Sequence, residues 1–278
     1  MPSKAIKDIG KDFLSPAVLR LVRKIFLKKS QIRFEGDFAT WEEATVQCTG
    51  YDAPHILAKV LDATLKVKRG EATCERDSVL FDEIEYAWPL LAGLMWAAAR
   101  HGGRLNVLDF GGALGSSYFQ NRKFLQTLTE VRWNVVEQAH YVEVGRKHIQ
   151  DEQLRFYKTV EECIKENQPN VVLLSSVLQY LKSPFDILKN LSATGARCLI
   201  IDRTPFSLDE KDKLLIQRVP SSIYTASYPM WVFSQSEFMN RLESDWRLVA
   251  SNISPEGWVQ STSGFDFSFK GMLLELSQ

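Results

Sequence analysis

The chain has 278 residues, 45% of them hydrophobic and 24% charged, which predicts a folded protein rather than a disordered chain, either one large α/β domain with an appendage or two modest domains that share a core. Its 34 basic and 34 acidic residues cancel, so no overall electric field draws the whole chain to nucleic acid or to a membrane. The four cysteines and four histidines show no metal-ligand spacing, so we expect no metal site.

The first 30 residues combine a basic amphipathic pattern with no export signal. The start, MPSKAIKDIGKDFLS, has no uninterrupted apolar run after its lysines, so we predict a cytoplasmic protein. Residues 16–29 carry Val18, Leu19 and Val22 at helical spacing among lysines and arginines. Docking of this apolar face onto the protein's own domain is the favoured interpretation, and contact with an anionic membrane surface is the alternative.

Residues 1–100 are predicted to form a helical extension that caps the functional edge of the following domain. Thr40, followed three residues later by Glu43, forms a capping box that predicts a helix start. The apolar segment 79–100 is predicted to form one helix, broken or kinked near Pro89.

From residue 104 onward, short β-branched runs alternate with helical stretches, which is the pattern of βαβ units around a parallel sheet. The predicted strands cover residues 104–110, 132–138, 154–158, 170–176, 196–203, 246–252 and 269–276. Helices separate the first five strands, whereas only a turn-rich segment separates the last two, which favours an antiparallel hairpin. We therefore expect residues 101–278 to form a Rossmann-like α/β sheet of five parallel strands plus a terminal antiparallel hairpin.

The stretch VLDFGGALGSS ends the first predicted strand and opens a helix, where open α/β sheets bind ligands. Its glycines, Gly111, Gly112 and Gly115, do not have the G-x-G-x-x-G spacing of a dinucleotide site, so a nicotinamide cofactor is disfavoured. Asp109 lies at the strand end, where its carboxylate suits a ligand with an ammonium group and no phosphate. S-adenosylmethionine fits this description.

The second predicted strand ends in VVEQ, which places another acid near the glycines. Glu137 follows Gly115 by 22 residues, the position from which an acid accepts hydrogen bonds from both ribose hydroxyls. Gln138 beside it is included in the predicted cofactor site. Either acid alone is read as a surface cap or ion-pair partner, but together with the glycines the two acids favour a nucleoside site.

These motifs resemble those of class I S-adenosylmethionine-dependent methyltransferases. LDFGGALG matches the motif D-x-G-x-G-x-G at Asp109, Gly111 and Gly115, with Ala113 in place of the middle glycine, and Glu137 matches the acidic second motif. The resemblance implies a class I methyltransferase fold with S-adenosylmethionine as cofactor. It fails after the third strand, where RFYKTVEE offers no counterpart of the acid that helps to hold adenine.

The segment NVVLLSSVLQYLKSP resembles the fourth-strand motif of the same family, which implies that Ser175 and Ser176 face the methionine part of the cofactor. A narrower similarity, carried by CTGYDAP, KRGEATCERDSVLFDE and VPSSIYTASYPMWVFS, is to an uncharacterised family of methyltransferases associated with bacterial surface-polysaccharide synthesis. It covers residues 40–276 and implies only weakly that the acceptor is a sugar.

Candidate catalytic residues follow the fourth and fifth strands. Asp202 is the candidate base, with an equal alternative as a partner for Arg203 or a helix cap. Gln179 and Tyr180 are candidates for orienting the substrate, and packing between strand and helix is their alternative.

Candidate substrate-binding residues are Arg203 and the side chains of an aromatic loop expected at 204–235, in which Tyr224, Tyr228 and Trp231 are singled out. The alternative for this segment is a hydrophobic plug over the sheet. In the polar segment 75–78, Arg76 is a candidate for binding the carboxylate of the cofactor or an anionic substrate. The simpler interpretation is that this segment forms an exposed helix cap.

The sequence therefore predicts a methyltransferase acting on an oxygen or nitrogen of a small acceptor, with a sugar or nucleotide-linked sugar among the candidates. A noncatalytic S-adenosylmethionine-binding partner protein is the first alternative, and a nicotinamide-dependent sugar-modifying enzyme is the second. No nucleic-acid partner is expected, because the chain beyond residue 30 is net acidic and has no basic stripe.

Overall fold

The computed structural model describes residues 32–50, 54–76, 78–221, 223 and 225–277. The predicted helix at 16–29 lies outside these residues, and so does Tyr224.

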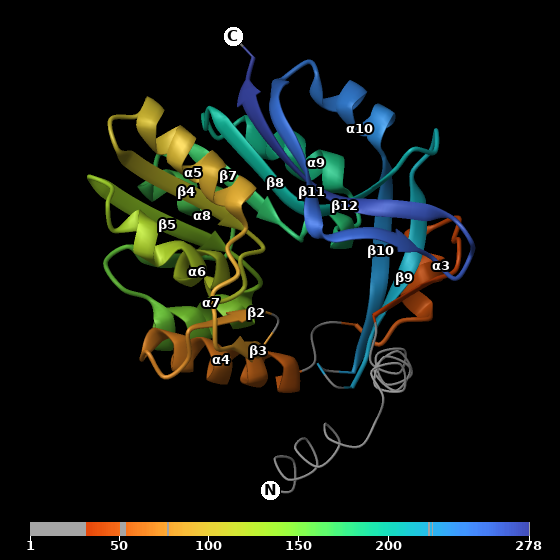
Figure 1. Cartoon of the computed structure of the whole chain (residues 1–278), viewed down its shortest axis with the longest axis horizontal. Helices are drawn as coiled ribbons and strands as arrows, with labels where there is room; N and C mark the ends of the chain where they lie inside the picture. Colours follow the sequence, from red (N-terminus) through yellow and green to blue (C-terminus); the bar gives the residue numbers. More distant parts are fainter. Residues whose placement is uncertain (1–31, 51–53, 77, 222, 224, 278) are drawn as a thin grey trace, which may run out of the picture.

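A mostly parallel sheet forms the centre of the molecule (Figure 1). Its parallel part has the spatial order β6 (Leu154–Tyr157), β5 (Glu130–Val136), β4 (Arg104–Phe110), β7 (Val171–Ser175) and β8 (Cys198–Ser207). The antiparallel pair β11 (Trp246–Gln260) and β12 (Asp266–Leu276) extends the sheet, with β12 next to β8. The predicted Rossmann-like α/β fold, with five parallel strands and a terminal antiparallel hairpin, is confirmed. Strand order reverses between β4 and β7, so a crevice forms at the carboxyl ends of these two strands.

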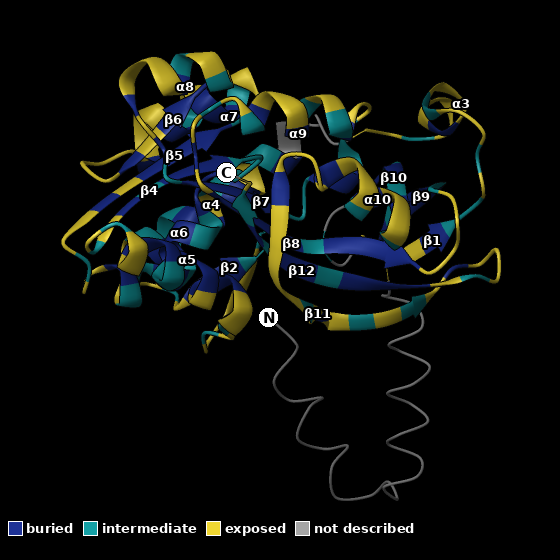
Figure 2. Cartoon of the chain, turned by 90° about the horizontal axis from the view of Figure 1, so that it is seen from above, coloured by how far each residue is buried: buried dark blue, intermediate teal, exposed yellow. Residues whose placement is uncertain are grey.

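Both faces of the parallel strands are covered (Figure 2). Val107 belongs to one hydrophobic cluster and Leu108 to another, because successive side chains of a strand point to opposite faces. The covering helices that follow residue 101 are α6 (Ser116–Leu125), α7 (Ala139–Val144) with the π-helical turn η1 (Gly145–Ile149), α8 (Val160–Glu166), the short 3₁₀ turn η2 (Leu178–Tyr180), α9 (Pro184–Ser192) and α10 (Gln235–Leu242). Helix α5 (Trp88–Arg100), which precedes them, also packs on β4 and β8. Among the helices in the described ranges, none is long and apolar enough to cross a membrane.

The predicted aromatic loop at 204–235 is largely strand, which corrects the prediction. β8 continues to Ser207, and β9 (Lys213–Val219) and β10 (Ala226–Ser234) pair antiparallel, with β1 (Arg33–Glu35) on the outer edge of β9. The Pro and Ser residues of this segment suggested a loop. Because β10 pairs with β8 only at Phe233 and Ser234, the edge of β10 at Pro229 is open, and an open edge tolerates proline. These strands lie beside the parallel sheet, at the right of Figure 1.

The segment before residue 101 is mainly helical in its described part, with α3 (Trp41–Val46), α4 (Pro54–Lys68) and α5 (Trp88–Arg100). The capping box is confirmed: the Glu43 amide donates to Thr40 Oγ1 at 3.2 Å, and the Thr40 amide donates to Glu43 Oε2 at 3.3 Å.

The single helix predicted over 79–100 is wrong. A hairpin of β2 (Cys74–Arg76) and β3 (Val79–Phe81) occupies its start and also replaces the helix cap expected at 75–78. Pro89 lies in the first turn of α5, where its missing amide costs nothing, so it begins the helix rather than kinking it.

Candidate functional site

A cavity of about 510 Å³ lies at the carboxyl ends of the parallel strands and reaches the β9–β10 pair. Many of the predicted site residues line it: Asp109, Gly111, Gly112, Glu137, Gln138, Ser175, Ser176, Tyr180, Arg203 and Tyr228. The lining does not include four others, Gly115, Gln179, Asp202 and Trp231.

The glycine loop after β4 leaves no room for larger side chains. A Cβ on Gly111, whose φ is +72°, would lie 2.4 Å from Val177 Cγ2, and a Cβ on Gly112 would lie 2.4 Å from Asp109 Oδ2. Ala113 keeps the left-handed backbone that a glycine usually provides, with φ of +49°. Gly115, with φ of +91°, is instead the N-cap of α6, and a Cβ there would lie 2.9 Å from Leu154 Cδ2. The loop therefore presents backbone to the cavity.

Asp109 is buried at the cavity wall, and its two carboxylate oxygens differ in their hydrogen bonds. Only 1% of the residue is exposed, and Trp133 Nε1 donates to Oδ2 at 2.8 Å. Among the described residues, Oδ1 has no hydrogen-bond partner. The pKa of Asp109 is raised from 3.8 to about 7, chiefly by burial and to a smaller extent by the Glu137 charge, against the lowering effects of the Trp133 hydrogen bond and the Arg203 charge. A cationic ligand would satisfy Oδ1 and restore the ionised form.

Glu137 connects the end of β5 to the glycine loop. Its Oε1 accepts from the Gln138 amide at 2.9 Å, and its Oε2 accepts from the Ala113 amide at 3.4 Å. These bonds fix the carboxylate at the cavity wall, next to the glycine loop.

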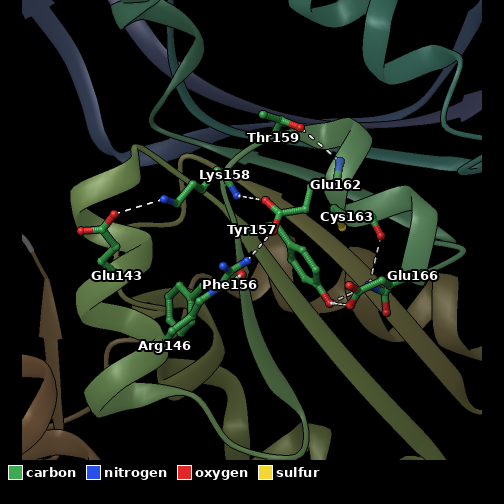
Figure 3. A network of polar contacts seen from close by, with 10 residues as sticks. Glu143, Arg146, Phe156, Tyr157, Lys158, Thr159, Glu162, Cys163 and Glu166 are labelled. Carbon is green, nitrogen blue, oxygen red and sulfur yellow. Dashed lines mark hydrogen bonds and ion pairs between the residues drawn. The ribbon is translucent and has the colours of Figure 1, made fainter.

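Lys158, which follows β6, lines the cavity where the resemblance places an acid. Its Nζ lies 3.1 Å from Glu143 Oε1, and its amide donates to Glu162 Oε2 at 2.7 Å (Figure 3). Arg146 in turn donates to Glu162 Oε1 at 2.6 Å. Neither Lys158 nor Tyr141, which also lines the cavity, was predicted, because no motif marks them.

A β-bulge in β8 directs Arg203 into the cavity. The pairing of β8 with β12 passes from Ile201–Met272 to Thr204–Lys270, so Asp202 and Arg203 together face one residue of the partner strand. Arg203 has φ of +48°, a strained conformation of the kind that bulges use to redirect a side chain near functional sites.

The carboxylate of Asp202 supports this bulge instead of facing the cavity. Ser175 Oγ donates to Asp202 Oδ2 at 2.9 Å, and Arg203 Nε lies 3.3 Å from the same oxygen. Gln179 is fully buried, and its Nε2 donates to Ser176 Oγ at 3.2 Å and to the Arg203 carbonyl at 3.3 Å. The structure thus brings both residues to the back of the cavity wall and not to its surface.

Two tyrosines and a glutamine form the cavity wall on η2, β9 and β10. Tyr180 OH donates to Gln217 Oε1 at 2.9 Å, Gln217 Nε2 donates to Tyr228 OH at 3.3 Å, and the two rings pack edge to face at 4.9 Å. Sequence reasoning missed Gln217, although it is the one uncharged polar residue in the strand KLLIQRV. Trp231 lies outside this wall, because its ring stacks on Trp41 at 5.9 Å and its Nε1 donates to the Leu181 carbonyl.

The β2–β3 hairpin adds Arg76 to the cavity lining. Its neighbour Glu75, which is 6% exposed, accepts from the hydroxyl of Ser116, the first residue of α6, and so fastens the hairpin to the glycine loop. Within the described part of the chain, no acidic side chain lies within ion-pair distance of Arg76. The described residues also contain no group of three or more His, Cys, Asp or Glu side chains that could hold a metal ion.

No family model matches the sequence, and no curated protein matches it. The chain is similar in structure to the 1,6-didemethyltoxoflavin-N1-methyltransferase of Burkholderia thailandensis, at 16% identity over 88% of this chain and 100% of that one, with a TM-score of 0.40. It is also similar to the N-terminal domain of EvdMO1, crystallised with SAH and D-fucose, at 13% identity over 81% of this chain and 100% of that one, with a TM-score of 0.45. A third similar structure is an S-adenosylmethionine-dependent methyltransferase from Clostridium acetobutylicum, at 9% identity over 80% of this chain and 99% of that one, with a TM-score of 0.45.

Proposed function

We propose that the protein binds S-adenosylmethionine and transfers its methyl group to an oxygen or nitrogen of a small acceptor. The observation that carries this proposal is the buried carboxyl of Asp109, whose Oδ1 has no partner among the described residues, beside a loop of glycine backbone. A carboxylate here favours an ammonium group and disfavours a diphosphate, because two negative groups at this depth would repel each other strongly.

The residues at the cavity wall fit such a cofactor. Asp109 would hold the ammonium group, Glu137 and Gln138 the ribose, and Ser175 and Ser176 the methionine part. When bound, the cofactor supplies a methyl group on a positively charged sulfur.

The acceptor side needs residues that hold the reacting atom in line with that methyl group, and a base is useful rather than obligatory. We propose that Tyr180, Tyr228 and Arg203 do this, since all three line the cavity. Asp202 and Gln179 are proposed as supports of Arg203 and Ser176 instead of as catalytic groups. The narrower sequence resemblance makes sugars and nucleotide-linked sugars the first acceptors to test.

A second candidate function is a noncatalytic S-adenosylmethionine-binding protein. One observation favours it: the candidate base Asp202 is only 5% exposed and is committed to Ser175 and Arg203.

Calorimetry and a turnover assay test both candidates. We expect calorimetry to show binding of S-adenosylhomocysteine. Titration with NADH, measured by the absorbance and fluorescence of that cofactor, should show no binding. Conversion of labelled S-adenosylmethionine on addition of a hydroxylated acceptor supports the enzyme. Tight binding with no conversion across a broad acceptor panel supports the noncatalytic protein, and preference for NADH would refute both.

A further inference from the structure

The wall of the cavity is charged on one side and uncharged on the other. Asp109, Glu137, Lys158, Arg76 and Arg203 contribute charges from the parallel strands and from the β2–β3 hairpin. The opposite side lies on η2, β9 and β10, together with Ile223 between these two strands. We call it the neutral wall, and it consists of Tyr180, Gln217, Val219, Ile223, Tyr228 and Pro229.

Two of the cations in the lining are already balanced by acids outside it. Lys158 Nζ lies 3.1 Å from Glu143, and Arg203 Nε lies 3.3 Å from Asp202.

The proposed donor brings one net positive charge, from its sulfonium, because its ammonium and carboxylate cancel. The two acids of the lining, Asp109 and Glu137, lie on the side proposed to hold this donor, which leaves the neutral wall for the acceptor. This step rests on the proposed function.

Gln217 organises the neutral wall. It is 6% exposed, and its amide joins the hydroxyls of Tyr180 and Tyr228 through bonds of 2.9 and 3.3 Å. An amide donates and accepts hydrogen bonds without ionising, which suits hydroxyl groups, whereas the six described side chains of this wall offer an ion no opposite charge in place of its water. The rings of the tyrosines and the side chains of Ile223 and Pro229 offer apolar surface beside these polar atoms.

We propose that the neutral wall binds the acceptor as an uncharged, hydroxyl-bearing ring of the kind found in neutral sugars, and that Gln217 determines this specificity by positioning the two tyrosines. A charged group of the acceptor, if it has one, lies away from β9 and β10.

The test uses the full-length protein saturated with S-adenosylhomocysteine and ligand-observed NMR titration. The probes are uncharged methyl glycosides of galactose, glucose, mannose and rhamnose, together with two charged counterparts of the galactoside, methyl galacturonoside and methyl galactosaminide. We expect at least one uncharged glycoside to bind about tenfold or more tightly than its charged counterparts. Tightest binding of a charged probe, or no binding of any uncharged glycoside, would overturn the proposal.

Two variants of Gln217 separate specificity from folding. Gln217→Leu should weaken binding of the uncharged glycoside about tenfold while leaving the affinity for S-adenosylhomocysteine within about twofold of the wild type. Gln217→Glu keeps the shape of the side chain and should shift the preference toward the galactosaminide. The exposed Gln150, in the control variant Gln150→Leu, should change neither. Equal behaviour of the variants at 217 and 150 would overturn the role of Gln217, whereas failure of the wild type to bind S-adenosylhomocysteine would instead refute the proposed function.

Discussion

The glycine-loop side of the cavity and the β9–β10 side present polar groups to a ligand by different means. On the glycine-loop side, left-handed backbone at Gly111 and Ala113 brings the chain close to the ligand, and two carboxylates add charge. On the β9–β10 side, regular strand backbone carries tyrosine and glutamine side chains joined by hydrogen bonds. Changes on the first side should therefore alter the affinity for the donor, and changes on the second should alter the choice of acceptor.

The largest expected effect on the glycine-loop side is that of Asp109→Asn. Removing the negative charge takes away the partner of the donor's ammonium group, so the affinity for S-adenosylhomocysteine should fall about a hundredfold or more in calorimetry. The exposed Asp82, changed in the same way to Asn, is the matched control and should bind like the wild type. An unchanged affinity in Asp109→Asn would contradict the assignment of the donor to the glycine-loop side of the cavity.

The same variant should be more stable than the wild type at alkaline pH. Burial raises the pKa of Asp109 from 3.8 to about 7, so between these values the folded protein binds more protons than the unfolded chain. The free energy of unfolding of the wild type should therefore fall as the pH rises from about 4 to about 7, by on the order of 4 kcal/mol at most. Urea denaturation at pH 5 and pH 8 checks this. The free energy of unfolding should fall much less between these pH values in Asp109→Asn than in the wild type, and an equal fall in both proteins would contradict the prediction.

Glu137→Ala should have a smaller effect on the donor. Loss of the hydrogen bonds proposed to the ribose should cost about 1–3 kcal/mol, or roughly a tenfold to hundredfold loss of affinity for S-adenosylhomocysteine. Binding of homocysteine, which lacks the ribose, should not change. A loss that is equal for both ligands would show that Glu137 only supports the loop through the Ala113 amide.

The smallest expected effect comes from Ala113→Gly. The left-handed conformation at this position strains an alanine, while glycine gives the unfolded chain more freedom, so the two contributions partly cancel. The free energy of unfolding should rise by about 0–1 kcal/mol, with little change in donor affinity. A fall of more than about 1 kcal/mol in thermal or urea unfolding would show that Ala113 is not strained.

The parallel half of the molecule could be predicted from the sequence because each of its signals is local. Runs of β-branched residues such as NVVLLSS form strands that are buried on both faces, and the glycines with Asp109 lie where β4 meets α6. Glu137 was predicted because its distance along the chain from the glycines is characteristic.

In the β9–β10 half the two main strands are neighbours in the chain, but β1 pairs with β9 and Tyr180 bonds to Gln217 from distant positions, which no local pattern reveals. Pro229 and the neighbouring serines are typical of loops, so the strand β10 was not predicted. Gln217 contacts Tyr180 and Tyr228 only because the fold places β9 beside β10 and η2. Asp202 was predicted as a base because it follows the fifth strand, but the bulge at Arg203, which sequence alone does not show, turns its carboxylate to Ser175.

The most direct test of the central claim is a crystal structure of the protein with S-adenosylhomocysteine bound. The account predicts that the amino group of the ligand lies within hydrogen-bonding distance of Asp109 Oδ1 and that its ribose hydroxyls face Glu137. A ligand whose amino group points away from Asp109, or whose ribose lies beyond the reach of Glu137, would contradict it.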